Sequence, residues 1–552
     1  VGLLASRGHA DPSALAALLD EPRAGLHDPL LLPDAAAFAA RIERASANGE
    51  RALVFGDFDA DGLTGLAIMT LALRRRGLDT ATYVPDRGDE GHGLSVAAIE
   101  RAAAEGRTLI VTVDCGTSSG PEIELAATRG IDVLVTDHHR PPPALPPALA
   151  VVNPMRADAR YPDRRLCGAG VALKVAQLLI GDEALALADL AAIGTIADVA
   201  PLAGENRAIV RLGLALMRQA PRPGLAALFD VAAVDRQRID PDRLAFAVIP
   251  RLNAVGRVGD AARAASLLLA TDASAAKALA DELEAANGLR RELLAAALVE
   301  ARAAVAELPA APITIVAGPW PVGIIGLLAG RLADELGRPA VVFCNDADPW
   351  RGSARAGGNF DLAGALGSMP ELFVRYGGHS AAAGCHIEAA NVDAFRERLL
   401  ALADGLAPLA PSLTLDLVVD AADTDYRLLR ELAHLEPVGT GNPEPLVGIR
   451  GLLVGRVRPA NGGHTQLLLR KEREVLDGIC FGRDDLAGRV AEGDRLDLVA
   501  RLVSRTFGGY ESLQLEVRDL APPGTLDRLV GGDPVEAAPA AAAPAAAATR
   551  AA

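Results

Sequence analysis

The chain has 552 residues, and its 71 acidic side chains outnumber its 55 Lys and Arg side chains, so the formal net charge is −16. Half of the residues are hydrophobic, which excludes a disordered chain, and the length suggests about three or four domains. The acidic balance argues against a protein that binds nucleic acid through overall positive charge.

Short apolar runs alternate with helical patterns over residues 51–152. Helices are expected at Gly62–Arg76 and Pro121–Arg129. Strands are expected at Ala52–Phe55, Thr82–Val84, Leu109–Val113, Val133–Val135 and Ala150–Val152. Buried runs separated by helices are typical of βαβ units, so we expect a parallel sheet with a site at the carboxyl ends of its strands. Residues 168–220 are expected to be mostly helical.

Four further patterns follow along the chain. Asp260–Glu307 is rich in Ala, Leu, Glu and Arg, and it predicts a long helix that connects two lobes. The α/β alternation restarts over residues 312–405, with strands at Ile313–Val316 and Ala340–Phe343 around a helix at Gly323–Leu336. Residues 413–521 predict short strands, such as Gln466–Leu469 and Ser512–Val517, and a small β-barrel. The Pro/Ala-rich tail from Pro534 is expected to be disordered.

These patterns predict an α/β fold class with six segments. In chain order they are an N-terminal helical segment (1–50), a parallel-sheet catalytic domain (51–258), a long connecting helix (259–310), a second α/β lobe (311–408), an OB-like β-barrel (409–525) and the tail (526–552).

The cysteines and the apolar segments bear on location. Five cysteines are scattered without a CxxC pair, which indicates reduced thiols and a cytoplasmic protein rather than disulfides or a zinc site. No apolar stretch reaches the roughly 18 uncharged residues of a membrane helix, and no signal peptide is visible. We therefore expect a cytoplasmic location and no membrane partner.

Carboxylates follow three of the predicted strands, and a fourth lies in GTIADVAPL. In chain order they are the alternating Asp57, Asp59 and Asp61 of GDFDADG, Asp114, the Asp137-His138-His139 triplet, and Asp198. Unpaired anions packed this closely raise one another's pKa, so such a cluster is stable only if cations neutralise it. Alone, a DxDxDG segment resembles part of a calcium loop and an aspartate after a strand is often a helix cap. Four such features in order make coincidence improbable.

Carboxylates combined with an imidazole suit two divalent cations, Mg²⁺ or Mn²⁺. Two metals about 3.5–4 Å apart support phosphoester hydrolysis. The predicted metal ligands are Asp57, Asp59, Asp61, Asp114, His138 and Asp198, with Asp57 as either a ligand or a residue that orients one. We expect His139 to meet the phosphate or donate a proton.

Together these motifs resemble the DHH phosphoesterase superfamily. The likeness rests on DFDADG (57–62), VDCGTSS (113–119), DHH (137–139) and GTIADVAPL (194–202). PRLNAVGR (250–257) resembles the segment that closes the first lobe in the RecJ branch. RGSAR (351–355) and GGH (377–379) look like the DHH-associated domain, and residues 435–445 resemble the start of the RecJ OB fold. The similarity runs from about Gly8 to Leu520.

The resemblance implies a 5′→3′ exonuclease specific for single-stranded DNA that uses Mn²⁺ or Mg²⁺ in recombination and repair. It puts the six predicted ligands on metal-centre positions and His139 on a phosphate-facing position. Its strand-holding positions match Asn253, Arg257, Ser353, Arg355, Gly377, Gly378 and His379. The implied partners are single-stranded DNA, a single-strand-binding protein and a helicase, and the implied state is a monomer.

One departure from the family pattern is visible. The family often shows Trp-His-x-Gly before the second-lobe helix, and this chain has Trp320-Pro321-Val322-Gly323. The change removes a phosphate contact and leaves the metal chemistry untouched. In the barrel, the candidates for strand contacts are Arg456, Arg458, Arg470, Arg501, Arg505, Phe507 and Tyr510. A barrel that only braces the catalytic lobes is the alternative.

Two other functions compete with a long-strand exonuclease. One is a phosphodiesterase of the same superfamily that acts on short oligonucleotides or cyclic dinucleotides, and the other is a non-catalytic single-strand-binding scaffold. The extra segment 413–521 favours long strands over short substrates. The scaffold requires the loss of metal ligands, and the sequence keeps all of them.

Overall fold

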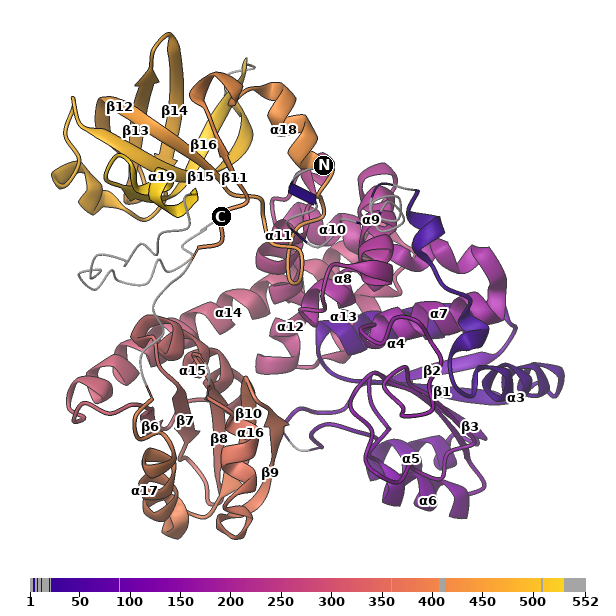
Figure 1. Cartoon of the computed structure of the whole chain (residues 1–552). Coiled ribbons are helices and arrows are strands. Elements are labelled where there is room, and N and C mark those ends of the chain that lie inside the picture. The colour runs from indigo at the N-terminus through magenta and orange to yellow at the C-terminus, as the bar shows by residue number, and fades with distance from the viewer. Residues whose placement is uncertain are drawn as a thin grey trace.

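The computed structural model describes residues 3, 4, 7, 11, 19 and 21–530, apart from residues 89, 359, 407–412 and 508–509. Two α/β lobes are joined by the long helix α14 (Ala273–Ala306), and a β-barrel sits beside them (Figure 1). Within this part of the chain, no helix is long and apolar enough to cross a membrane. The tail predicted from Pro534 lies outside the described residues.

The first lobe is built on a parallel sheet with the strand order β2-β1-β3-β4-β5. Its strands are β1 (Arg51–Gly56), β2 (Asp79–Tyr83), β3 (Leu109–Val113), β4 (Asp132–Thr136) and β5 (Ala150–Val152). All four neighbouring pairs run parallel, and β3 is buried at every position, as its continuous apolar run requires. The predicted parallel sheet is confirmed, although β2 begins three residues before the predicted start at Thr82.

Helices cover the sheet and continue beyond it. Those near the strands are α3 (Ala35–Ala47), α4 (Ala60–Arg75), α5 (Val96–Ala104) and α6 (Gly120–Thr128), of which α5 was not predicted. The predicted helical region contains α7 (Gly168–Ile180), a 3₁₀ segment (Gly181–Leu187), α8 (Ala188–Ala197) and α9 (Gly204–Gln219). One hydrophobic core joins Val113 of β3, Leu66 of α4 and Leu190 of α8, so the sheet edge that carries the aspartates rests on packed helices.

The end of the first lobe leads into α14. The elements here are α10 (Pro223–Val231), α11 (Pro241–Arg243), a π-helical turn (Leu244–Val248), α12 (Ile249–Val258) and α13 (Ala262–Leu268). The single helix predicted over residues 260–307 is wrong, because α13 ends at Leu268 and α14 begins at Ala273. Asp272 Oδ1 accepts a hydrogen bond from the Ala275 N–H at 2.8 Å and caps the new helix. The connecting helix itself is confirmed, and its 34 residues span roughly 50 Å.

The second lobe has a mixed sheet in the order β6-β7-β8-β10-β9. Its elements are β6 (Thr314–Gly318), α15 (Val322–Leu336), β7 (Ala340–Cys344), β8 (Trp350–Arg355), α16 (Leu362–Gly367), β9 (Phe373–His379), β10 (Ala382–Ile387) and α17 (Val392–Leu402). Only the pair β6–β7 is parallel. The predicted strand-helix-strand order over residues 313–343 is confirmed, and β9 forms an exposed edge.

The C-terminal domain is a closed barrel, as predicted. Its elements are β11 (Leu417–Val419), α18 (Tyr426–Ala433), β12 (Val447–Ala460), β13 (His464–Lys471), β14 (Glu474–Cys480), a 3₁₀ turn (Asp484–Gly488), β15 (Arg495–Phe507), β16 (Tyr510–Ala521) and α19 (Thr525–Val530). Strand β12 pairs with both β13 and β15, which closes the barrel. Residues 526–530 were assigned to the tail but belong to α19, because Leu526 is buried and its N–H donates to Asp497 at 3.0 Å.

The barrel is bonded to the first lobe. Arg207 on α9 donates hydrogen bonds to the carbonyls of Leu435 (2.8 Å) and His434 (3.0 Å), which precede the barrel. The Leu202 N–H donates to the Thr440 carbonyl at 2.7 Å. These bonds hold the barrel and the catalytic lobe in a fixed relation.

Candidate metal centre

The first acidic motif forms the turn between β1 and α4. Asp59 caps α4, because its Oδ1 accepts from the N–H groups of Asp61 (3.0 Å) and Gly62 (3.1 Å). A Cβ on Gly62 would lie 2.6 Å from the Asp57 carbonyl oxygen, so the turn closes this tightly only with glycine. A larger residue than Gly62 at the end of the motif would therefore clash with the backbone of Asp57.

Asp57 has partners on two sides. Its Oδ1 accepts from the Phe58 N–H at 2.8 Å, and its Oδ2 lies 2.9 Å from Nδ1 of His92. His92 lies in the loop between β2 and α5, and the sequence motifs gave no sign of it. This pairing fits the prediction that Asp57 orients the turn better than a role as a central ligand.

Asp61 points at the N-terminus of α7. Its Oδ2 accepts from the Gly168 N–H at 2.7 Å and its Oδ1 from the Ala169 N–H at 2.8 Å. A helix N-terminus offers unpaired N–H donors, so both carboxylate oxygens are satisfied although Asp61 is only 2% exposed. The orientation of Asp61 is thus set by backbone groups.

Asp114 directly follows β3 and adopts a left-handed backbone with a φ of 62°. This conformation is uncommon for a residue other than glycine. A Cβ added to Gly168 would lie 2.5 Å from the Asp114 Cβ, so the carboxylate is pressed against the first turn of α7. Asp114 Oδ1 is buried, and Nε2 of His138, which lies 3.0 Å from it, is outside good hydrogen-bond geometry. A buried carboxylate oxygen in this state is suited to a cation.

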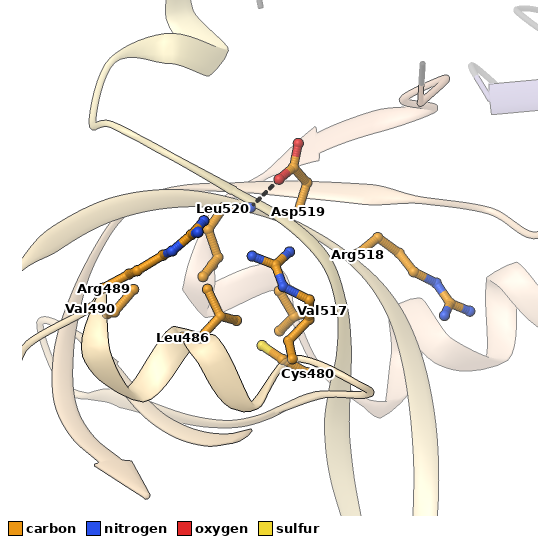
Figure 2. A pocket seen from close by; sticks show the side chains of 9 residues that line it. Cys480, Leu486, Arg489, Val490, Val517, Arg518, Asp519 and Leu520 are labelled. Atoms are coloured by element: carbon orange, nitrogen blue, oxygen red, sulfur yellow. Dashed lines mark hydrogen bonds between the residues drawn. The ribbon is translucent and has the colours of Figure 1, made fainter. Parts of the chain in front are cut away.

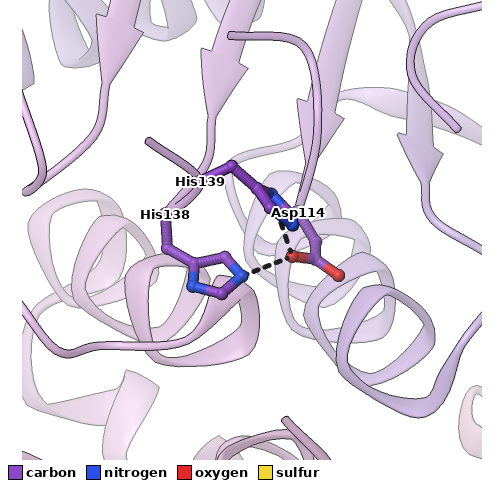
Figure 3. Close-up of side chains that lie close together, drawn as sticks. All are labelled: Asp114, His138 and His139. Atoms are coloured by element: carbon purple, nitrogen blue, oxygen red, sulfur yellow. Dashed lines mark ion pairs between the residues drawn. The ribbon is translucent and has the colours of Figure 1, made fainter. Parts of the chain in front are cut away.

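His138 lies at the centre of the carboxylates. Its Nε2 is 3.0 Å from Asp114 Oδ1 and 3.8 Å from Asp61 Oδ2, and its Nδ1 is 3.8 Å from Asp198 Oδ2. Asp198 sits at the carboxyl end of α8. Figure 3 shows His138 and His139 directed toward Asp114. The structure therefore brings together residues from three predicted strand ends and one helix end.

Two overlapping groups place one ligand atom per residue within 4.8 Å of one another. They are Asp114, His138 and His139, and Asp61, His138 and Asp198. Carboxylate oxygens with imidazole nitrogens are donors that Mg²⁺ or Mn²⁺ accepts. The residues present thus fit the predicted pair of divalent ions, with Asp57 and Asp59 beside them.

His139 is held by Asp137. Asp137 Oδ1 lies 2.8 Å from Nδ1 of His139, and Asp137 also accepts the N–H groups of Thr117 and His138 at 3.0 and 2.7 Å. Burial opposes ionisation of Asp137, but its bonds to His139 hold its pKa below the usual range. The same bond raises the pKa of His139 to about 9. Asp137 is absent from the predicted site, although it is the first letter of the DHH motif.

The crowded carboxylates disfavour their own ionisation when no cation is considered. Burial, then the charges of Asp57 and Asp61, raise the pKa of Asp59 to about 6. Burial, then Asp61, raise the pKa of Asp198 to about 7 and that of Asp114 well above its usual value. Cations would relieve this repulsion, as the sequence predicted.

Three guanidinium groups converge beside the aspartates. Arg257 on α12 donates to the Gly323 carbonyl at 3.0 Å, and burial, then the charges of Arg87, Arg290 and Arg355, lower its pKa to about 9. Burial, then Arg87, lower the pKa of Arg355 on β8. Arg87 itself is attracted by the charges of Asp59 and Asp57. Arg87 was not predicted, although it follows the carboxyl end of β2.

Asn253 was predicted to line the groove, and it also supports the acidic turn. Its Oδ1 accepts the Ala60 N–H at 2.7 Å, in the first turn of α4. The neighbouring Gly256 lets α12 approach closely, since a Cβ there would lie 3.0 Å from the Phe58 carbonyl oxygen. Helix α12 thus braces the turn that carries Asp59.

The second-lobe residues share one end of its sheet. Gly384 of β10 pairs with Ser353 on one side and Gly377 on the other. The next row on that face places Ala382 between Arg355 and His379. Two strand spacings, roughly 10 Å, therefore separate Arg355 from His379. Gly378 lies next to His379 at this end of β9, and its φ of 141° is a backbone conformation that favours glycine.

Pro321, which replaces the usual family histidine, occupies the N-cap position of α15. Its carbonyl accepts the Ile324 N–H at 2.9 Å. Gly323 contacts α12 so closely that a Cβ would lie 2.0 Å from the Arg257 carbonyl oxygen. The departure from the family pattern leaves the contact between α12 and α15 in place.

The barrel offers two small cavities away from the aspartates. Arg456 and Arg458 line one of about 170 Å³. The other, of about 230 Å³, has an apolar floor with Leu486 and Val517, and Arg489 lies at its side (Figure 2). Arg501, predicted to contact the strand, is paired with Glu444 at 3.2 Å and is correspondingly less available. The predicted side chains of Phe507 and Tyr510 lie outside the described part of the chain.

Comparisons with known proteins agree with the three-part architecture. The family model of the DHH family N-terminal domain matches residues 51–195, the DHHA1 domain matches 310–404 and the RecJ OB domain matches 415–519. The single-stranded-DNA-specific exonuclease RecJ of Bacillus subtilis is 34% identical over 94% of this chain and 67% of its own length. The Dickeya dadantii protein of the same name is 35% identical over 91% of this chain and 93% of its own length.

A solved structure covers almost the same range. RecJ of Thermus thermophilus in complex with Mn²⁺ matches with a TM-score of 0.81 and 31% identity, over 94% of this chain and 75% of that chain. The same protein in complex with Mg²⁺ matches with a TM-score of 0.74 and 30% identity, over 94% of this chain and 74% of that chain.

Proposed function

Because the chain belongs to the RecJ family of single-stranded-DNA-specific exonucleases, we propose that it removes nucleotides from the ends of single-stranded DNA by metal-dependent hydrolysis of phosphodiester bonds. The observation that carries this function is the cluster around His138, where Asp61, Asp114 and Asp198 approach one imidazole within 3.0–3.8 Å. Burying three carboxylates around one imidazole ring is costly unless a cation compensates their charge, so packing of the core alone does not explain the cluster.

In this proposal the cluster holds two Mn²⁺ or Mg²⁺ ions. Asp61, Asp114, His138 and Asp198 are the central ligands, with Asp59 and Asp57 at the edge of the site. When bound, such ions activate a water molecule and stabilise charge on the phosphate oxygens. The two backbone N–H groups on Asp61 and the steric contact on Asp114 fix the ligands before any ion binds. That preorganisation lowers the cost of assembling the site.

His139 is the group we assign to the phosphate. Asp137 holds its Nδ1 and favours the protonated ring, with a pKa of about 9, so its other nitrogen is available to donate to an anionic oxygen. More than half of the His139 side chain is exposed, which suits a group that meets substrate. Asp137 thereby acts as a positioning residue.

The arginines supply the contacts to the end of the strand. Arg87, Arg257 and Arg355 are half-buried close to one another, and burial lowers the pKa of each guanidinium group. Guanidinium groups bind phosphate in a bidentate manner, so a terminal phosphate fits among them. Ser353 lies 3.2 Å from Arg355 Nη1, and Asn253, Gly377, Gly378 and His379 line the remaining cleft in this proposal.

A local basic site can bind an anionic strand although the whole chain has a net charge of −16. Binding depends on a few guanidinium groups in a cleft rather than on overall charge, and it should weaken as salt rises. The barrel is proposed to hold strands too long for the cleft alone. Digestion from the 5′ end, a role in recombination and repair, a monomeric state, and partnership with a single-strand-binding protein and a helicase remain predictions from the family. A cytoplasmic location remains a prediction from the scattered cysteines.

Digestion of end-labelled strands tests the function. Single strands labelled at either end are incubated with Mn²⁺, Mg²⁺ or EDTA, beside blunt duplex and dinucleotide substrates. We expect metal-dependent release of mononucleotides from a 5′ label, no reaction in EDTA and little digestion of blunt duplex. Cleavage restricted to dinucleotides would favour a short-substrate phosphodiesterase, and binding without hydrolysis would favour a scaffold.

A further inference from the structure

Phe246 lies in the π-helical turn between α11 and α12 and is 63% exposed. The flanking Leu244 and Val248 are fully buried in the core of the first lobe. Among the described phenylalanine and tyrosine side chains, none is more exposed. An exposed ring of this size gains nothing from the core, and π turns are frequent at functional sites. We propose that Phe246 stacks on a base of the single strand between the barrel and the catalytic cleft, an inference that rests on the proposed function.

The ring belongs to a stripe of unburied residues along one helical face. Phe246 is followed on this face by Pro250, Asn253 and Arg257, at spacings of four, three and four residues. The alternate face, with Leu252 among others, is buried. The stripe therefore leads from Phe246 to the arginine cluster without crossing the core.

Both ends of the stripe contact the parts that a long strand would touch. One turn before Phe246, Asp242 lies 3.9 Å from Arg501 Nη1 of the barrel. At the other end Arg257 donates to Gly323 of the second lobe. In Figure 1, α11 lies near the barrel and α12 continues from it toward α14. Phe246 thus sits on the path from the barrel to the aspartates.

The spacing predicts which strands reach the ring. Eleven residues separate Phe246 from Arg257, or roughly 15 Å along the helix. At about 3.4 Å per stacked nucleotide, this distance corresponds to about four nucleotides. A strand whose terminal phosphate is held by Arg257 therefore places a base on Phe246 only when it is longer than about four nucleotides.

Positive charge beside the stripe supports a nucleic acid as the occupant. Arg290 on α14 lies close enough to Arg257 on α12 for their charges to interact, whereas the nearby Arg251 is neutralised by an ion pair with Glu284. A basic groove combined with an aromatic ring is the usual arrangement of sites that bind single strands without reading sequence. An apolar protein partner would not need the guanidinium groups of Arg257 and Arg290 beside the ring.

Binding in EDTA tests the inference separately from hydrolysis. The full chain carrying Phe246→Trp, Phe246→Ala or Phe246→Leu is titrated with oligothymidylates of 2 to 20 nucleotides, and Val299→Ala, an equally exposed apolar change on α14, is the control. We expect Phe246→Ala to raise the Kd of a 20-mer by about 5- to 150-fold, the range of one lost base stack. Phe246→Leu should also bind weakly, because it keeps bulk but lacks a ring, and Val299→Ala should match the wild type.

The Trp variant gives a second readout. Relative to wild-type fluorescence from Trp320 and Trp350, Phe246→Trp should be quenched by strands longer than about four nucleotides and not by dinucleotides. Unchanged 20-mer affinity of Phe246→Ala, or unquenched fluorescence of Phe246→Trp at saturation, would overturn the inference. Failure of the wild type to hydrolyse strands in Mn²⁺ would instead overturn the proposed function.

Discussion

Replacing Gly168 with alanine should displace Asp114 and reduce hydrolysis without unfolding the protein. The added Cβ would lie 2.5 Å from the Asp114 Cβ and 2.6 Å from its Oδ1, whereas ordinary contacts begin at 3.4 Å. The carboxylate must therefore move by about 1 Å, or α7 must shift by that amount. A misplacement of about 1 Å can cost on the order of 100-fold in rate. Overpacking of this kind also costs about 1–3 kcal/mol in the free energy of unfolding.

Gly170→Ala is the matched control, two residues along the same helix. Its Cβ would meet Leu166 at 3.4 Å, which is ordinary contact. Alanine is also the better helix former by about 0.5–1 kcal/mol, so stability should stay equal or rise. Hydrolysis of a single strand at several Mn²⁺ concentrations, together with urea unfolding, separates lost activity from lost folding. A folded Gly168→Ala protein with wild-type rates, or an equal loss in Gly170→Ala, would refute the reasoning.

Other changes follow from the same geometry. Asp114→Ala should reduce metal-dependent hydrolysis by more than about 100-fold, because even residues that only orient ligands cost 10- to 100-fold, while strand binding in EDTA persists; retained hydrolysis would count against the ligand assignment. Arg257→Gln should lower the slope of log affinity against log salt by about 0.7, and an unchanged slope would remove Arg257 from the phosphate contacts. Glu50 accepts a 2.7 Å bond from Arg41, which lowers its pKa below 4.5. The contribution of the Arg41–Glu50 pair to the free energy of unfolding is present above pH 4.5 and is lost as the pH falls through the lowered pKa of Glu50. Glu50→Gln should therefore lower the free energy of unfolding by about 1–2 kcal/mol at pH 7 and by less at pH 4. Equal losses in urea unfolding at the two pH values would contradict this.

Local pattern predicted most of the fold. Continuous apolar runs such as Leu109–Val113 become buried parallel strands, because helices cover both faces of the sheet. The break before α14 was missed, since Asp272 interrupts no hydrophobic pattern and acts through one capping bond. The early start of β2 at Asp79 reflects pairing with Arg51 of β1, which the sequence of β2 alone does not encode.

Part of the candidate site was predicted from the sequence, and part of it is placed only by the tertiary fold. The strand-end rule placed Asp61, Asp114 and His138 at one edge, and the structure brings them together. Arg87 and His92 lie in a loop without a motif, so only the tertiary fold places them beside the aspartates. Arg501 was expected to contact the strand, but it forms an ion pair with Glu444, which is distant in sequence and could not be foreseen from the pattern.

The residues around His138 are assigned here to a pair of catalytic metal ions. Titration of the folded chain with Mn²⁺, followed by the loss of the free-ion electron paramagnetic resonance signal, tests this assignment without any substrate. Two ions should bind per wild-type chain, and binding of both should be lost or strongly weakened in His138→Ala, since both groups of candidate ligands share His138. Wild-type stoichiometry and affinity in a folded His138→Ala protein would contradict it.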